Sequence, residues 1–181
     1  MHSQILTERL FAPLDAVEVE IVMRAVASAE RIGLSRIARV ATRLGNGWLY
    51  PLLTLALLAM PLNAPLRFLL AAALSLGIAL VAYPLLKRVL GRARPCDYDP
   101  ALVRDLAPLD TYSCPSGHAM TAAAYGVPLV FAWPAALPLV IALCALIGWS
   151  RVALGHHYVS DVVIGTVLGA AIAGSVSALL Y

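Results

Sequence analysis

The chain has 181 residues, of which 61% are hydrophobic and only 13% charged, and its formal net charge is +3. Soluble domains contain about 25% charged residues, so this composition excludes an ordinary soluble protein and indicates a polytopic membrane protein. The small net charge, with no basic run interleaved with aromatic residues, gives no indication of nucleic-acid binding.

The first 44 residues are too charged for a transmembrane segment, and we expect interfacial helices there. Residues 1–12 are predicted to be a loosely held start. Residues 13–44 are amphipathic, with Val22 and Val26 on the apolar face and Glu18 away from it, and Gly33 is expected to interrupt the helix. The piece after Gly33 carries three arginines at helical spacing, Arg36, Arg39 and Arg43. These arginines either contact lipid phosphates or form a solvated face.

Charged residues are absent from long stretches of the remaining sequence. Arg67 is the only one between Leu44 and Leu86, none occurs from Thr111 to Ser150, and none follows Asp161. Since a helix needs about 20 apolar residues to cross a bilayer, we expect an all-α membrane bundle with about five transmembrane helices. The expected spans cover residues 48–62, 66–86, 116–133, 134–149 and 159–180.

The most polar stretch between apolar segments runs from Ser150 to Asp161. Polar groups this close to a bilayer are costly, which indicates a functional site. If the chain is helical from Tyr158, His157 and Asp161 share a face. The carboxylate could then hold one imidazole nitrogen and leave the other free as a nucleophile or base. Arg151 would add a fixed positive charge suited to phosphate or carboxylate.

The polar ends of the predicted spans fall on one side of the bilayer. The second span ends at Lys87, the third begins at Ser116, the fourth returns at Ser150 and the fifth starts near Asp161. Arg67 is the exception. Isolated polar residues that converge on one rim indicate an active site.

Three polar clusters share this side: Lys87 with Arg94-Pro95, the run Pro115-Ser116-Gly117-His118, and Ser150 to Asp161. Backbone N–H groups at Ser116 and Gly117, at a helix start, favour an anion. Lys87, Arg94 and Arg151 would surround its other oxygens. With one histidine attacking and the other protonating the leaving group, the set predicts phosphoryl transfer without a metal.

In order and spacing, these clusters resemble the signature of the type 2 phosphatidic acid phosphatase superfamily, which is related to glucose-6-phosphatase and the vanadium haloperoxidases. The resemblance covers about residues 45–181, and the family's usual first span is not matched. It implies a single membrane-embedded phosphatase domain over residues 1–181, with interfacial helices over 1–44 and the catalytic bundle over 45–181. It implies a lipid phosphate substrate held at the bilayer, no cofactor and no metal, and leaves the oligomeric state open.

The resemblance also implies roles for the motif residues. His157 would be the nucleophile that forms a phosphohistidine, Asp161 would orient it, and His118 would be the general acid and then the base. The phosphate would be bound by Lys87, Arg94, Arg151, Ser116 and the Gly117 amide. His156 lies beside the motif at the wrong spacing, so we expect it to have a supporting role or none.

Three alternatives remain open. A zinc ion could be held by His118, His156, His157 and Asp161, although three nearby cations disfavour it. A vanadate-dependent oxidase could use the same anion site, although such relatives are soluble. A non-catalytic lipid-binding or transport relative could keep the bundle, but it would not need both histidines and the aspartate.

For the substrate, compact loops favour an isoprenyl pyrophosphate such as the undecaprenyl carrier, with phosphatidylglycerophosphate, phosphatidic acid or a lipid A phosphate as alternatives. The distribution of arginines places the active rim in the cytoplasm. The resemblance places it on the outer, periplasmic face of a bacterial inner membrane, and we expect that orientation. A disulfide between Cys96 and Cys114 would agree with it, but two free thiols are equally compatible with the sequence.

Overall fold

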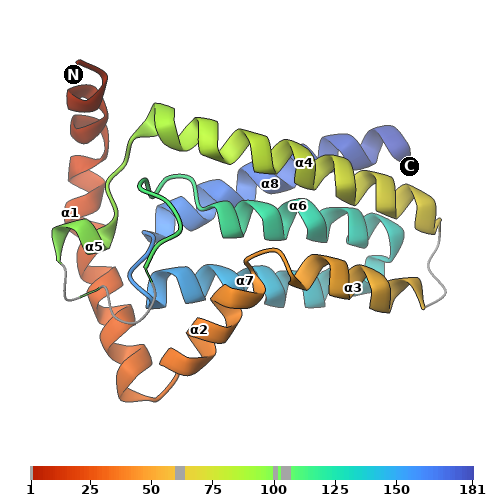
Figure 1. The fold of residues 1–181 in the computed structure, drawn as a ribbon, viewed down its shortest axis with the longest axis horizontal. Helices are drawn as coiled ribbons and strands as arrows, with labels where there is room; N and C mark the ends of the chain where they lie inside the picture. Colours follow the sequence, from red (N-terminus) through yellow and green to blue (C-terminus); the bar gives the residue numbers. More distant parts are fainter. Residues whose placement is uncertain (1, 60–63, 100–101, 103–106) are drawn as a thin grey trace.

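The computed structural model describes residues 2–59, 64–99, 102 and 107–181, and it is all-α (Figure 1). The expected all-α membrane bundle is therefore confirmed. The helices are α1 (His2–Arg31), α2 (Ser35–Leu44), α3 (Leu49–Leu58), α4 (Pro65–Leu90), α5 (Pro95–Tyr98), α6 (Gly117–Ala132), α7 (Leu137–Ala153) and α8 (Val159–Leu180), with the 3-10 turn η2 (Pro134–Ala136) before α7.

Helices occupy each of the five predicted spans, but their lengths differ. Within the described residues, three segments are long and apolar enough to cross a membrane: Pro65–Tyr98, Pro134–Ala153 and Val159–Leu180. At 1.5 Å per residue, α3 is about 15 Å long and α6 about 24 Å, against a hydrocarbon core of about 30 Å. The protein is an integral membrane protein in which α3 and α6 are shorter than a full span.

Helices α3, α4, α6, α7 and α8 run alongside one another, and α1 lies across one end of them (Figure 1). The interruption predicted at Gly33 is confirmed, because α1 ends at Arg31 and Gly33 has a φ of +73°. Helix α2 then packs on α7 with Ala38, Ala41 and Thr42 buried. Two helices extend further than expected: α4 continues past Lys87, and α7 continues past Trp149.

Small residues allow α6 and α8 to pack closely at the centre of the bundle. The buried face of α8 repeats every four residues, through Asp161, Gly165, Gly169, Ala173 and Ser177. A Cβ added to Gly165 would lie 2.5 Å from the Ser116 carbonyl oxygen, and one added to Gly169 would lie 2.2 Å from that of Met120. In membranes, such small residues let helix backbones approach each other. This contact fixes the start of α6 against the first turns of α8.

Candidate active site

One cavity of about 300 Å³ opens where α4 and α7 end and where α6 begins. Six of the predicted site residues line it: Lys87, Arg94, Gly117, His118, Arg151 and His157. Asp161 and Ser116 do not line it and are completely buried. Its remaining wall includes the Gly45-Asn46-Gly47 turn and apolar side chains such as Pro51, Leu76 and Leu80. The structure therefore brings together residues that the sequence places in three separate clusters.

His157 lies in the turn between α7 and α8 and not within the last helix. The turn is closed by backbone bonds from the N–H groups of His156 and His157 to the Arg151 carbonyl, and Gly155 provides a φ of +69°. The sequence predicts that His157 and Asp161 share one face of a helix. Because α8 begins at Val159, His157 instead lies before the helix and approaches Asp161, in its first turn, from there. Nδ1 of His157 lies 3.4 Å from Oδ2 of Asp161, without hydrogen-bond geometry.

The tautomer of His157 follows from its other ring nitrogen. Nη1 of Arg94 lies 3.3 Å from Nε2, and a guanidinium can only donate. We therefore assign Nε2 as the acceptor and place the proton on Nδ1, next to Asp161. Burial, followed by the charges of Arg151, Arg94 and Lys87, holds the pKa of His157 well below its usual range. The ring is accordingly neutral at physiological pH, and Nε2 is the nitrogen that carries no proton.

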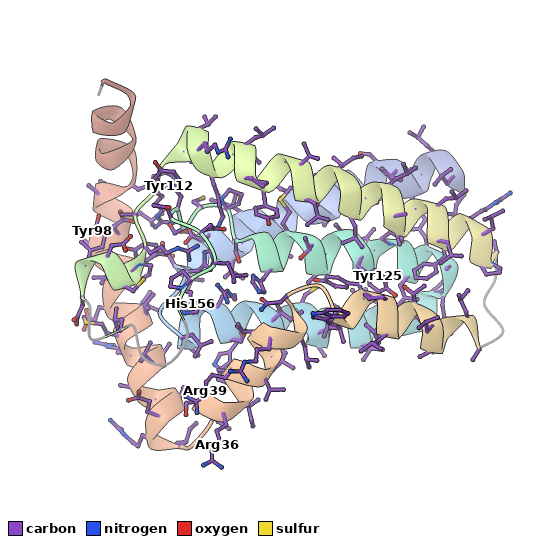
Figure 2. The ribbon with its side chains drawn as sticks, viewed as in Figure 1. Arg36, Arg39, Tyr98, Tyr112, Tyr125 and His156 are labelled. Carbon is purple, nitrogen blue, oxygen red and sulfur yellow. The ribbon has the colours of Figure 1, made fainter. Side chains whose placement is uncertain are left out.

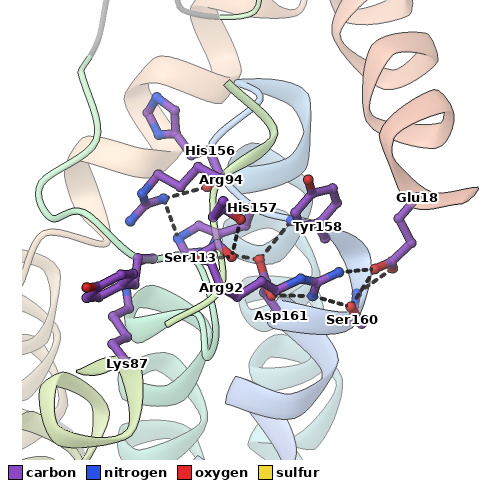
Figure 3. Close-up of polar contacts among 12 residues, drawn as sticks. Glu18, Lys87, Arg92, Arg94, Ser113, His156, His157, Tyr158, Ser160 and Asp161 are labelled. Atoms are coloured by element: carbon purple, nitrogen blue, oxygen red, sulfur yellow. Dashed lines mark hydrogen bonds and ion pairs between the residues drawn. The ribbon is translucent and has the colours of Figure 1, made fainter. Parts of the chain in front are cut away.

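Asp161 caps the start of α8. Its Oδ2 accepts a hydrogen bond of 2.9 Å from the Tyr158 N–H, and its Oδ1 accepts one of 2.6 Å from Arg92 (Figure 3). The contact of Arg92 with Asp161 was not predicted from the sequence. It is buried among carboxylates, because it also pairs with Asp15 and Glu18 of α1. The expectation that Glu18 points away from the apolar face is wrong, since Glu18 is buried against this arginine.

Two of the three cations in the cavity share one carboxylate, that of Asp110. Nζ of Lys87 donates to its two oxygens at 2.7 and 2.9 Å, and Nη2 of Arg94 donates to Oδ1. Burial raises the pKa of Asp110, but Lys87 and Arg94 outweigh that effect and lower it. Because Lys87 and Arg94 both bind the Asp110 carboxylate, they can also bind the anionic oxygens of another group.

The third cation, Arg151, is buried in the last turn of α7. Its Nη1 donates to Thr42 of α2 at 3.2 Å, and the Thr42 hydroxyl also lies 2.9 Å from that of Ser150. Its Nε has no hydrogen-bond partner among the described residues, and neither does the buried hydroxyl of Ser116. Buried donors are seldom left unpaired, and Arg151 lines the cavity, so its Nε remains available to a phosphate.

His118 faces the turn that precedes α3. Its Nε2 lies 2.6 Å from Oδ1 of Asn46, and an amide oxygen only accepts, so Nε2 carries a proton that it donates in this contact. Gly45 has room for no side chain, since a Cβ there would lie 2.9 Å from the His118 ring. The contact of Asn46 with the site was not predicted from the sequence. The turn contributes the hydrogen-bond partner of His118.

The anion site at the start of α6 differs in one respect from expectation. The Ser116 N–H donates to the Asp161 carbonyl at 3.0 Å, so it is not available to a phosphate. Gly117 lines the cavity next to the Tyr83 ring. A Cβ added to Gly117 would lie 3.1 Å from that ring. Gly117 therefore remains as the candidate contact from this helix, since Ser116 is completely buried and does not line the cavity.

Other candidate residues lie around the cavity or away from it (Figure 2). His156 is buried, and its backbone carbonyl accepts a hydrogen bond from Arg94, which is a supporting contact. Arg36 and Arg43 are exposed, Arg39 is half-buried, and none of the three lines the cavity. Cys96 and Cys114 are buried free thiols, so the structure does not contain the disulfide considered above. Across the described part of the chain, no three His, Cys, Asp or Glu side chains are grouped as a metal site.

Comparisons with known proteins identify relatives of this chain. The model of the PAP2 superfamily matches residues 68–181. A decaprenylphosphoryl-5-phosphoribose phosphatase from Mycobacterium tuberculosis is 34% identical over 163 residues, covering 87% of this chain and 88% of that protein. A lipid A 1-phosphatase from Rhizobium johnstonii is 37% identical over 90 residues, but the match covers only 37% of its length.

One solved structure resembles the whole chain. It is a transmembrane PAP2-type phosphatidylglycerolphosphate phosphatase from Bacillus subtilis, with a TM-score of 0.67 and 25% sequence identity. The match covers 99% of this chain and 96% of that structure. The likeness therefore includes the helices before residue 45, which the sequence resemblance left out.

Proposed function

Since the chain belongs to the PAP2 superfamily and is a lipid phosphate phosphatase, we propose that it works through a phosphohistidine on His157. The observation that carries this proposal is the position of the His157 ring, whose Nε2 lies 3.3 Å from Nη1 of Arg94 in a cavity lined by three cations. A nucleophile of this kind needs no metal to activate it.

In the first step, the Nε2 lone pair attacks phosphorus and the bond from phosphorus to the leaving oxygen breaks. His118, which is protonated on both ring nitrogens when the phosphate dianion is bound, donates its Nε2 proton to that oxygen and is left as the neutral imidazole. Lys87, Arg94 and Arg151 stabilise the charge on the other phosphate oxygens. In the second step, water attacks the phosphohistidine, His118 takes the proton from the water, and the phosphorus–nitrogen bond breaks.

We propose a polyprenyl lipid as the substrate. Leu76 and Leu80 continue the cavity wall along α4, where a lipid chain could lie while its phosphate meets the cations. The first candidate is the terminal phosphate of an isoprenyl pyrophosphate such as the undecaprenyl carrier. Three cations and the Asp110 carboxylate leave two positive charges in the site, which match a single phosphate dianion. A phosphomonoester carried by a prenyl lipid is therefore the second candidate, and the mycobacterial relative is named for a substrate of that class.

The proposal is tested by phosphate release from detergent-purified protein in excess EDTA. The panel contains isoprenyl pyrophosphate, prenylphosphoryl-phosphoribose, phosphatidylglycerophosphate, phosphatidic acid and lipid A. We expect release that survives EDTA and is lost in His157→Ala, with a prenyl lipid hydrolysed fastest. Loss of activity on chelation would indicate a metal enzyme, and activity of His157→Ala would overturn the phosphohistidine. Faster release from phosphatidylglycerophosphate would overturn the prenyl assignment.

We propose that the active end faces the outside of the cell, with α1 and α2 at the membrane surface and Arg36, Arg39 and Arg43 near lipid headgroups. In support, Arg92 is held in internal ion pairs, so its positive charge is not evidence that this end of the bundle faces the cytoplasm. Arg88 and Arg67 are exposed near opposite ends of α4, about 32 Å apart. In intact cells, an impermeant maleimide should label Arg88→Cys and not Arg67→Cys; the reverse pattern would overturn the orientation.

A further inference from the structure

A buried ion cluster centred on Arg92 lies directly behind the nucleophile and outside the cavity. The guanidinium contacts three carboxylates: Asp161 at 2.6 Å through Nη1, Asp15 at 2.7 Å through Nη2, and Glu18 at 2.8 Å through Nη2. Its planar face lies 4.1 Å from the centroid of the Tyr158 ring. Arg92 does not line the cavity, so phosphate binding does not explain it.

The cluster joins α1 to the first turn of α8. Glu18 pairs with Arg92 and also accepts hydrogen bonds from the backbone N–H and the hydroxyl of Ser160, next to Asp161 (Figure 3). Asp15 accepts from both Nε and Nη2 of Arg92. Two acidic residues of α1 therefore fix the guanidinium from the side opposite Asp161.

Asp161 needs this guanidinium for two reasons. Its carboxylate is completely buried, and a buried carboxylate without a positive partner takes up a proton. A protonated Asp161 would lose the negative charge that attracts the proton that the proposed tautomer places on Nδ1 of His157. The bond from Arg92 to Oδ1 also sets the direction of the carboxylate, so that Oδ2 faces His157.

We propose that Arg92 is a positioning residue for the nucleophile: it keeps Asp161 ionised and aimed at His157, and α1 holds Arg92 in place through Asp15 and Glu18. The inference rests on the proposed role of His157. The segment between α4 and α5 then contains two arginines with separate functions, Arg92 and Arg94. Arg94 meets the phosphate side of the His157 ring, whereas Arg92 acts on the opposite side through Asp161.

The test compares Arg92→Gln and Arg92→Lys with Arg88→Gln, a control on the exposed surface of the preceding helix. We expect kcat to fall about tenfold to hundredfold in both Arg92 variants, because small misplacement of a reacting group costs that much. KM and the inhibition constant for inorganic phosphate should stay within about twofold, since the cavity cations are intact. A rise in KM or in that inhibition constant with unchanged kcat would overturn the proposal.

The pH profile separates positioning from a merely structural effect. Besides Arg92, the groups that face Asp161 are His157, the Tyr158 backbone N–H, the Ser113 side chain and Cys114, whose thiol pKa is raised to about 12 by burial and by Asp161. None of these four groups replaces the guanidinium charge. The kcat of Arg92→Gln should therefore rise with pH as Asp161 loses its proton, while Arg92→Lys keeps a flatter profile. A profile parallel to the wild type would contradict the role.

A double variant shows whether Arg92 acts through Asp161. If it does, Arg92→Gln combined with Asp161→Asn should be no slower than Asp161→Asn alone, and multiplied losses would overturn the proposal. If Arg92→Gln does not fold, Arg92→Lys carries the same comparison. Activity of His157→Ala would refute the proposed function itself. An inactive His157→Ala with full kcat in Arg92→Lys and Arg92→Gln would refute only this inference.

Discussion

The contact between Gly165 of α8 and Ser116 at the start of α6 predicts that one methyl group will disturb the active site from outside the cavity. In Gly165→Ala the new Cβ would lie 2.5 Å from the Ser116 carbonyl oxygen and 3.2 Å from its nitrogen. Opening the shorter contact to a van der Waals distance requires the helices to separate by about 0.7–1 Å. Overpacking of this kind costs about 1–3 kcal/mol of stability.

The same displacement moves Gly117 and His118, which follow Ser116 into the cavity. A misplacement near 1 Å can lower a rate about 100-fold, so we expect a tenfold to hundredfold loss of kcat. Gly174→Ala is the matched control, because a Cβ at Gly174 meets nothing within 4 Å on the same helix. That variant should keep its activity and gain up to about 1 kcal/mol of stability.

The assay combines thermal unfolding in detergent with phosphate release at saturating substrate. Gly165→Ala should unfold at a lower temperature than the wild type and turn over more slowly, whereas Gly174→Ala should do neither. If the two variants were equal in both measurements, the reasoning that α8 fixes the start of α6 through this contact would be refuted.

The acid limb of kcat/KM, corrected for ionisation of the substrate, should lie below pH 6.5, because the depressed pKa of His157 keeps the ring neutral until the pH falls through that lower value. A limb at or above pH 6.5 would show that the cavity does not depress this pKa. Asp110→Asn should strengthen inhibition by inorganic phosphate several-fold, since Asp110 occupies Lys87 and Arg94; weaker inhibition would mean that it orients the cations for the substrate. His118→Ala should slow a lipid phosphomonoester more than a lipid pyrophosphate, whose leaving group needs less protonation. Equal losses on both substrates would count against the general-acid role.

The sequence was sufficient to predict the helix bundle and the grouping of its motif residues. The lengths of the apolar segments define the helices. Because successive helices cross the membrane in opposite directions, Lys87, His118 and His157 fall at the same end. Both predictions depend only on the spacing of residues along the chain. Helix ends were less accurate, because hydropathy placed the end of the fourth predicted span at Trp149, whereas α7 carries Ser150 and Arg151 in its last turn.

Partners of the motif residues were missed because they come from distant parts of the chain. Asn46 meets His118 across 72 residues, and Thr42 meets Ser150 across 108. No periodic pattern links such positions in one sequence. Asp110 was likewise not predicted, because it bridges Lys87 and Arg94 across 23 and 16 residues of sequence.

Helix α1 shows why charge alone gave the wrong interpretation of Glu18. A hydropathy pattern treats each charge as a group that must face water or lipid headgroups. In a chain with few charges, a buried arginine such as Arg92 instead requires acidic partners from within the protein. Asp15 and Glu18 supply them at a spacing of three, which places both on one face of α1. The acidic residues that excluded α1 as a membrane span are therefore those that fasten it to the back of the active site.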